Sequence, residues 1–236
     1  MVIVAYNPSL NRDKFKLREV LMFSDFHSHL DDYTPGKLKE VLDRARAEDV
    51  EIILACGITT ESSQETINIS QNQTGIVVAV GIHPWNAISP SEDVMKRLGE
   101  LATQKKVAAI GEVGLDYVRS PDTREIQKEL FRQQVNLARE LNLPMNIHCK
   151  ESQQDIMDIL NEMGGSRLKG AAHGFSGDTT TLMDWLNLGF YISIGPRCFT
   201  RTYTPAFGEA VKRIPLDRLL MNRQELPAVS AAGMNC

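Results

Sequence analysis

Residues 23–31 read Phe-Ser-Asp-Phe-His-Ser-His-Leu-Asp, a β-rich run that passes directly into two histidines. A doubly wound open sheet would normally follow its first strand with a glycine-rich loop that holds phosphate. Here imidazoles and carboxylates stand in place of that loop. His27 and His29 are two residues apart, so they should leave a strand on the same face, and Asp25 is expected on that face too. The segment predicts a first strand that carries metal-ligating side chains.

Short β-rich runs recur after this segment, and amphipathic helical patterns separate them. Apolar runs such as Ile52–Ala55 and Ile76–Val80 are typical of parallel strands buried on both faces. Strand–helix alternation continued to eight strands predicts a (β/α)8 TIM barrel of the α/β class, with the open doubly wound sheet as the main rival. The candidate strands are Phe23–His27, Glu51–Cys56, Ile76–Ile82, Val107–Val113, Pro144–His148, Leu168–His173, Phe190–Ile194 and Arg218–Met221.

The two ends of the chain depart from a complete barrel. Residues 1–21 form an N-terminal extension, residues 22–221 the predicted barrel, and residues 222–236 an irregular C-terminal tail. The tail has no helical pattern, so we expect the eighth helix to be missing or truncated. Leu17, Val20 and Leu21 have helical spacing, and residues 12–21 are a candidate cover for the vacant position. The alternative is an extension without fixed structure.

Composition excludes several classes of protein. The chain of 236 residues is 42% hydrophobic and 24% charged, which is ordinary for a globular protein. A net charge of −4 argues against a broadly basic nucleic-acid-coating surface, although a local basic site remains compatible with it. The four cysteines form no CxxC pair, which argues against a zinc knuckle, and free thiols fit a reducing cytoplasm. No apolar run is long enough to span a membrane.

The histidines share one position relative to the strands. In a barrel the C-terminal ends of the strands converge on the face that holds the active site. Glu112 ends the fourth strand and is the natural bridge between two ions held about 3.5–4 Å apart. Imidazoles and carboxylates suit several first-row divalent ions. All five histidines lie at or just beyond a candidate strand end: His27, His29, His83, His148 and His173.

Five segments, taken together, resemble the TatD family of metal-dependent DNases among the amidohydrolase-like barrels. They occur in the family's order and, with the flanking strands, cover residues 22 to about 221. The segments are Asp25-Phe-His27-Ser-His29-Leu-Asp31, Gly81-Ile-His83-Pro84, Gly111-Glu112-Val-Gly-Leu-Asp116-Tyr117, His148-Cys149-Lys150-Glu151 and His173-Gly-Phe175-Ser176-Gly177.

The resemblance implies roles for these residues. His27 and His29 would hold one divalent ion, His148 and His173 a second, and Glu112 would bridge them, with Mg, Mn or Zn as candidate metals. Glu112 and His83 are the catalytic candidates, although His83 could equally be a structural turn residue. The implied activity is hydrolysis of DNA phosphodiesters by metal-activated water, as an exonuclease. The implied substrate contacts are Arg119, Lys150, Ser176 and Arg197, with no membrane or stable protein partner.

Strand eight departs from the family pattern. The family carries an acidic Glu-Thr-Asp-type motif there, whereas this chain reads Met221-Asn-Arg-Gln-Glu225-Leu-Pro227. Glu225 could replace the missing Asp as a metal ligand if one inserted residue is accepted, and Asn222 could be a neutral oxygen ligand. Two alternatives to a nuclease therefore stay open. One is a catalytically impaired metal-binding remnant, and the other is a related hydrolase of small amides or esters.

Overall fold

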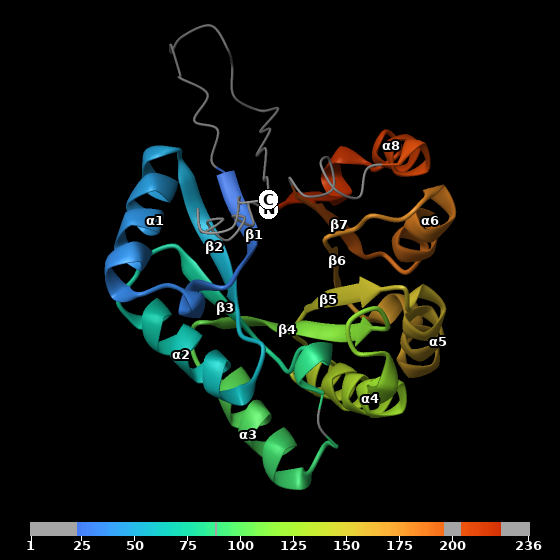
Figure 1. The fold of residues 1–236 in the computed structure, drawn as a ribbon, viewed down its shortest axis with the longest axis horizontal. Helices are drawn as coiled ribbons and strands as arrows, with labels where there is room; N and C mark the ends of the chain where they lie inside the picture. Colours follow the sequence, from blue (N-terminus) through green and yellow to red (C-terminus); the bar gives the residue numbers. More distant parts are fainter. Residues whose placement is uncertain (1–22, 88, 196–203, 223–236) are drawn as a thin grey trace, which may run out of the picture.

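The computed structural model describes residues 23–87, 89–195 and 204–222, which form a ring of parallel strands with helices outside it (Figure 1). Each strand pairs with the next one along the chain, in the order β1 to β8, and Cα atoms of β1 and β8 come within 8 Å of each other. The sequential order confirms the predicted (β/α)8 barrel. The rival prediction of an open doubly wound sheet is wrong. The strand order of such a sheet reverses at one point, whereas the order here does not.

The observed strands match the predicted ones closely, except that β4 runs three residues beyond its expected end. The strands are β1 Phe23–Ser28, β2 Val50–Cys56, β3 Ile76–Val80, β4 Val107–Asp116, β5 Met145–Lys150, β6 Gly170–His173, β7 Tyr191–Ile194 and β8 Leu219–Met221. The helices are α1 Pro35–Ala47, α2 Thr60–Gln71, α3 Glu92–Ala102, α4 Arg124–Glu140, α5 Gln153–Met163, α6 Thr179–Asn187 and α8 Pro205–Val211.

The core lies mainly between the strands and the surrounding helices. Its largest fully buried side chains include Trp185, Phe131, Phe190 and Phe207. Burying one such side chain contributes roughly 1.5–3 kcal/mol. A separate small cluster centred on Leu54 contains mostly small side chains: Cys56, Ala79 and Ala109, with Phe26 packed against them. The large apolar side chains thus hold the helices on the outside of the strands.

Helix α2 was not indicated by apolar spacing. Its buried residues are Ser63, Thr66, Ile67 and Ser70, so small polar side chains rather than leucines face the sheet. Its start is fixed by a capping box in which Thr59 and Ser62 each accept from the other's backbone N–H. A helix that buries hydroxyl-bearing side chains has no clear apolar stripe in the sequence.

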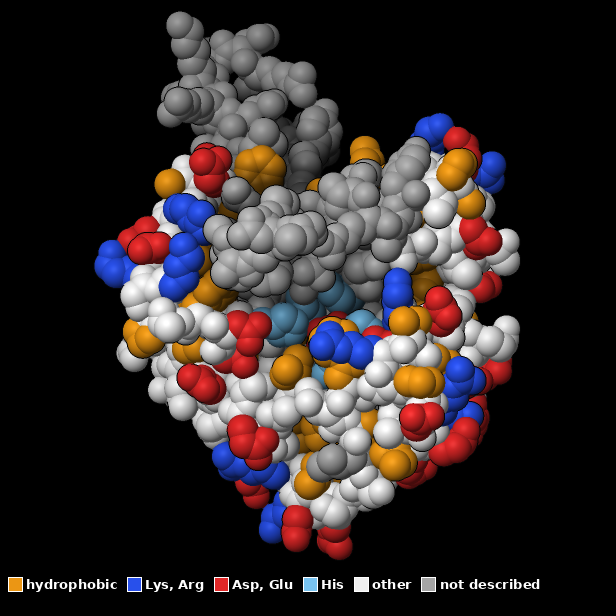
Figure 2. Space-filling view, viewed as in Figure 1, with side chains coloured by type: hydrophobic (Ala, Val, Ile, Leu, Met, Phe, Trp, Pro, Cys, Tyr) orange, Lys and Arg blue, Asp and Glu red, His pale blue; other side chains and the backbone are white. Residues whose placement is uncertain are grey.

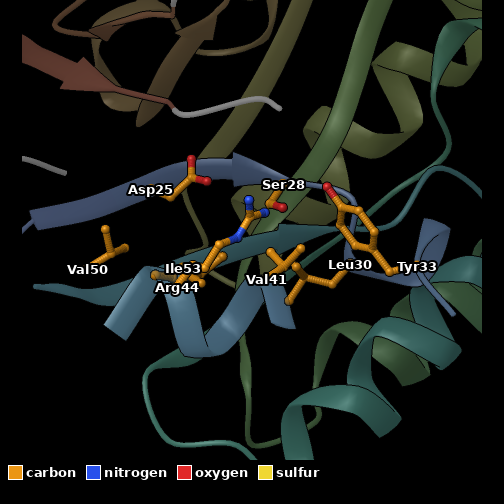
Figure 3. Close-up of a pocket in the computed structure, with 9 residues that line it drawn as sticks. Asp25, Ser28, Leu30, Tyr33, Val41, Arg44, Val50 and Ile53 are labelled. Carbon is orange, nitrogen blue, oxygen red and sulfur yellow. The ribbon is translucent and has the colours of Figure 1, made fainter. Parts of the chain in front are cut away.

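A β-bulge in β1 changes the face on which Asp25 lies. Asp25 is paired with Ile53 and Ser28 with Ala55, so β1 has one residue more than β2 over this stretch. Asp25 therefore lines a cavity of about 50 Å³ between β1 and α1, together with Ser28 and Arg44 (Figure 3). Its Oδ1 accepts from the backbone N–H of His27 at 3.1 Å, which stabilises the bulge. The expectation that Asp25 shares a face with His27 is wrong.

Several sequence predictions fall on other parts of the chain. The proposed cover by residues 12–21, the tail beyond Asn222, Arg197 and Glu225 all lie outside the described residues. Helix α8 precedes β8, so the predicted loss concerns a different helix, the one that would follow β8. That loss and the boundaries of the three segments therefore stay predictions. Among the described helices, none combines the length and the apolar character that crossing a bilayer requires.

Candidate metal centre

The six side chains predicted to meet at the barrel mouth do meet there, around the buried carboxylate of Glu112. Figure 2 shows the imidazoles grouped near the middle of one face of the molecule. The Oε2 atom of Glu112 lies 3.4 Å from Nε2 of His27 and 3.5 Å from Nε2 of His29. Those two Nε2 atoms are 3.0 Å apart. One oxygen of Glu112 therefore faces His27 of β1 and His29 just after that strand.

The second oxygen of Glu112 faces three histidines from other strands. Oε1 lies 2.9 Å from Nδ1 of His148, 3.5 Å from Nε2 of His83 and 3.9 Å from Nε2 of His173. The rings of His27 and His173 are stacked with centroids 3.6 Å apart, so the two groups of histidines adjoin each other. A single carboxylate thus lies between two sets of imidazole nitrogens.

Two glycines of β4 allow Glu112 to approach β5 so closely. A Cβ atom on Gly111 would lie 2.6 Å from Cβ of Asn146. A Cβ atom on Gly114, which has a φ of +137°, would lie 2.0 Å from the backbone oxygen of His148. Only a residue without a side chain fits at either position. The sequence Gly-Glu-Val-Gly therefore brings the Glu112 carboxylate against His148.

The Nδ1 atoms of three histidines each face a backbone carbonyl or a side-chain amide. Nδ1 of His29 donates to the backbone oxygen of Cys56 at 2.9 Å, since a carbonyl can only accept. Nδ1 of His27 lies 3.0 Å from the Asn146 amide, and Nδ1 of His173 lies 3.2 Å from the Asn222 amide. Hydrogen bonds of this kind fix which ring nitrogen keeps its lone pair.

The two asparagine amides can complete this pattern. Among the described residues, the buried Oδ1 atoms of Asn146 and Asn222 have no hydrogen-bond partner. A half turn of either amide brings Oδ1 to the neighbouring imidazole. In that orientation Oδ1 accepts from Nδ1–H of His27 or His173. The Nε2 lone pair of each histidine is then directed toward Glu112.

The carboxylate of Asp116 holds His148 in place. In the sequence, Asp116 stood out only as part of a motif. The Nε2 atom of His148 lies 3.0 Å from Oδ2 of Asp116, which also accepts from Nε1–H of Trp85 at 2.6 Å. The other oxygen of Asp116 accepts from the backbone N–H groups of Val118 and Arg119. A neutral His148 that donates from Nε2 to Asp116 keeps its Nδ1 lone pair toward Glu112.

His83 has the opposite arrangement. Its Nδ1 accepts from the backbone N–H of Trp85 at 3.1 Å, so the neutral ring carries its proton on Nε2. That Nε2 faces Glu112. The neutral ring of His83 therefore offers a proton at the site, whereas His29 offers a lone pair. This difference favours the predicted catalytic role for His83 over direct ligation.

Charge at the centre is distributed unevenly among these groups. Burial and the neighbouring His173 hold the pKa of His27 well below its usual range. Burial lowers the pKa of His173 to about 4 and also lowers the pKa of His83. Burial opposes protonation of His29 too, but its hydrogen bond and ion pair with Glu112 outweigh it and raise the pKa to about 9.

The pKa values of His148 and Glu112 are also shifted by their neighbours. Burial disfavours a charged His148, but its bonds to Asp116 and Glu112 prevail and raise its pKa to about 9. Burial would also raise the pKa of Glu112, yet the charges of His27 and His83 and the bond from His148 hold it well below the usual range. Glu112 is thus a buried anion whose neighbours supply positive charge, and a bound cation can supply the same charge.

The donor set fits a divalent metal ion. Two groups each bring three atoms of metal-ligating type within 4.8 Å of one another: His27–His29–Glu112 and His83–Glu112–His148. In the second group the neutral ring of His83 carries its proton on the nitrogen that faces the site, so Glu112 and His148 are its ligand candidates. Imidazole nitrogens and a carboxylate suit Zn and Mn among other first-row metals. The partners on the far ring nitrogens of His29 and His148 are those expected behind metal-binding histidines.

The predicted substrate contacts divide between two places. Lys150 and Ser176 line a cavity of about 270 Å³ beside His173, and Gln153 lies in its wall. Arg119 lies instead over the indole ring of Trp85, with Cζ 3.9 Å from the ring centroid. The carboxamide nitrogen of Gln153 is buried without a partner among the described residues.

The end of β8 places Asn222 at the centre, where the resemblance leads one to expect an acidic residue. Asn222 is 4% exposed, and its N–H donates to the backbone oxygen of Ile194 at 3.0 Å. A Cβ atom on Gly195 would lie 1.8 Å from Oδ1 of Asn222. Asn222 contacts Nδ1 of His173, so it is placed to orient that histidine rather than to bind an ion itself.

The barrel and its cluster of histidines define a metal-dependent hydrolase. Comparison with known proteins identifies the family. The family model described as TatD related DNase matches residues 24–222, and the chain belongs to this family. The chain is 38% identical to the uncharacterized metal-dependent hydrolase YabD of Bacillus subtilis, over 85% of this chain and 78% of the relative.

Two further relatives extend this comparison. The chain is 31% identical to the 3′-5′ ssDNA/RNA exonuclease TatD of Klebsiella pneumoniae, over 77% of this chain and 69% of that protein. Among solved structures, the TatD homologue YJJV of Escherichia coli K12 superposes with a TM-score of 0.77 at 27% identity, over 86% of this chain and 79% of that one.

Proposed function

We propose that this protein hydrolyses phosphodiester bonds of DNA from a chain end, with two divalent metal ions held by His27, His29, Glu112, His148 and His173. One observation carries the proposal. The two oxygens of Glu112 face different sets of histidine nitrogens, which is the arrangement required of a carboxylate that bridges two ions. Bound there, the ions would polarise phosphoryl oxygens and lower the pKa of water.

The side chains around the centre orient the ligands. Cys56 fixes the ring of His29 and Asn146 that of His27, both through Nδ1. Asp116 fixes His148 through Nε2, and Asn222 does the same for His173 through Nδ1. Since all four contacts come from strands or strand ends, the ligands are held on the rigid part of the barrel. This arrangement limits the reorganisation needed when the substrate binds.

His83 is the candidate hydrogen-bond donor to the leaving oxygen. Its Nε2–H is held toward the centre by the bond from the backbone N–H of Trp85 to Nδ1. When the phosphodiester bond breaks, negative charge develops on the leaving oxygen, and a hydrogen-bond donor held close to it can stabilise that charge. Burial lowers the pKa of His83 and so favours the neutral ring, whose Nε2–H can donate such a bond.

The cavity beside His173 supplies polar contacts for the part of the substrate next to the reacting phosphate. Lys150 offers a cation to phosphate, and Ser176 offers a hydroxyl. The buried nitrogen of Gln153 adds a donor that needs an acceptor. DNA as the substrate is supported by the name of the exonuclease relative rather than by this cavity, which would accept other phosphate esters.

The replacement of an acidic residue by Asn222 favours a second candidate, a metal-binding protein with impaired hydrolysis. An amide next to His173 can orient the ring but cannot take a proton from water as a carboxylate can. If Glu225 binds an ion as predicted, it restores the missing charge. The two candidates agree on metal binding and differ on catalysis.

Activity and metal content together distinguish the candidates. Purified protein is analysed for bound metal and incubated with end-labelled single-stranded DNA and Mn²⁺ or Mg²⁺, with and without chelator. The nuclease predicts chelator-sensitive release of nucleotides that is lost in His148→Ala. Lys105→Ala, an exposed change ahead of β4 and so at the opposite end of the barrel, should retain full activity. Bound metal without cleavage would support the impaired protein, and cleavage that ignores chelator would contradict both.

A further inference from the structure

An exposed indole lies at the edge of the metal centre. Trp85, in the 3-10 turn Pro84–Asn86, is 44% exposed, and Val118 beside Arg119 is 52% exposed. The Arg119 guanidinium covers the Trp85 ring with Cζ 3.9 Å from its centroid. An aromatic ring and a cation thus form a small stacked surface, hereafter the Trp85–Arg119 platform. The motifs of the hydrolytic centre do not account for its exposure.

The platform is joined directly to the residues that orient the ligands. The Trp85 Nε1–H donates to Oδ2 of Asp116 at 2.6 Å, and the same oxygen faces Nε2 of His148. The Trp85 ring centroid is 4.5 Å from that of His83 and 6.1 Å from that of His148. Because these contacts fix the indole, a group stacked on it would lie at the edge of the centre, beside His83 and His148.

The chemistry of the platform suits an unpaired nucleotide. Aromatic side chains bind bases by stacking regardless of sequence, and arginine binds phosphate through its N–H groups. Among the described residues, Arg119 forms no ion pair with a carboxylate, so its charge is available to an anion. Duplex bases already stack on each other, whereas an unpaired base is free to stack on protein. The platform therefore favours single strands over duplexes.

The arginine need not obstruct the base. An exposed cation–π contact contributes only about a two- to fivefold factor in affinity, whereas stacking of a base on an aromatic ring contributes roughly five- to 150-fold. We propose that a nucleobase of a single-stranded substrate replaces Arg119 on the Trp85 ring, and that Arg119 turns to pair with a phosphate of the same strand. This inference rests on the proposed function and specifies which side chains hold the strand beside the centre.

Fluorescence of the protein offers a direct test, because its two tryptophans differ in exposure. Trp185 is 1% exposed and Trp85 is 44% exposed, so a quencher or a stacked base reaches Trp85 selectively. Metal-free protein in chelator is titrated with oligothymidylate and with an abasic strand of equal length. We expect saturable quenching by the oligothymidylate and at least fivefold weaker binding of the abasic strand. Equal affinity for the two strands would overturn the proposal.

Variants distinguish two roles of Trp85: stacking on a base, and donating a hydrogen bond to Asp116. Anisotropy of a labelled oligothymidylate should show at least fivefold weaker binding by Trp85→Ala and by Arg119→Ala. Trp85→Phe keeps a ring but loses the indole N–H, so it should bind within about threefold of wild type. Val118→Ala is the matched control on the same loop and should bind as wild type does. If Trp85→Ala and Arg119→Ala bind as tightly as Val118→Ala, the ring serves Asp116 alone and the proposal fails.

The same variants distinguish failure of the platform from failure of the proposed function. With Mn²⁺ present, Arg119→Ala should raise KM for single-stranded DNA at least fivefold with little change in kcat, because Arg119 touches no candidate metal ligand. Hydrolysis with an unchanged KM in Arg119→Ala would refute the platform and leave the nuclease intact. Base-dependent quenching by a protein that hydrolyses no phosphodiester would refute the nuclease and leave the platform intact.

Discussion

Asp116 offers the most specific test of how the metal centre is built. Its carboxylate accepts from Nε1–H of Trp85 at 2.6 Å and from the backbone N–H groups of Val118 and Arg119 at 3.0 and 2.8 Å. It also lies 3.0 Å from Nε2 of His148. Asp116→Asn has nearly the same shape and can keep the two backbone bonds through its amide oxygen. Its NH₂ group, however, would face two other N–H donors.

The expected cost follows from that mismatch. His148 can relieve the contact by moving its proton from Nε2 to Nδ1, but Nδ1 is the nitrogen that faces Glu112. The lone pair intended for the metal is then lost. Removing the partner behind a metal-binding histidine lowers metal affinity by roughly 10- to 100-fold, or about 1.4–2.7 kcal/mol. The donors left without an acceptor should also lower the folding stability of metal-free protein by about 1–3 kcal/mol.

Competition with a chromophoric chelator measures the affinity for Mn²⁺ or Zn²⁺, and thermal denaturation measures the stability. Asp155→Asn is a matched control, because Asp155 bonds to Tyr117 and Lys128 on the surface, away from the centre. We expect the control to bind metal as the wild type does. If Asp116→Asn also binds metal with wild-type affinity, Asp116 does not set the proton position of His148 and the reasoning is refuted.

Three further results are expected. His83→Gln should lower kcat by at least roughly 10²-fold in steady-state assays while metal affinity stays within about threefold, and a coupled loss of metal would show that His83 is a ligand. Gly114→Ala should lower the free energy of unfolding in chemical denaturation by about 1–3 kcal/mol or more, because its Cβ would lie 2.0 Å from the backbone oxygen of His148. Metal at 100 times its Kd should stabilise wild type by about 2.7 kcal/mol in thermal melts, and this gain should be absent in His27→Ala.

The fold was largely readable from the sequence because parallel strands and amphipathic helices have different apolar periods. Runs such as Ile76–Val80 and stripes such as that of α4 were predicted correctly. Helix α2 was missed because it buries Ser63 and Thr66, which carry no apolar signal. The face of Asp25 was predicted wrongly, because one extra residue in β1 reverses the alternation and leaves no trace in composition.

The candidate site was predictable to the extent that barrel topology gathers strand ends. That rule placed all five histidines and Glu112 together, as the structure confirms. It could not reveal the residues behind them. Asn146 is an unremarkable polar residue inside a strand, and its contact with His27 joins positions 119 residues apart. The contact of Asp116 with His148 could not be predicted either, because it depends on β4 extending to Asp116.

The central claim is that one carboxylate joins two ion sites, and calorimetric titration with Mn²⁺ tests it most directly. Wild-type protein should bind two ions per chain, so the titration should give a stoichiometry of two. Glu112→Gln should lose measurable binding at both, because each set of histidines uses one oxygen of the same side chain. A wild-type protein that binds no ion, or a Glu112→Gln variant that still binds two, would contradict the account.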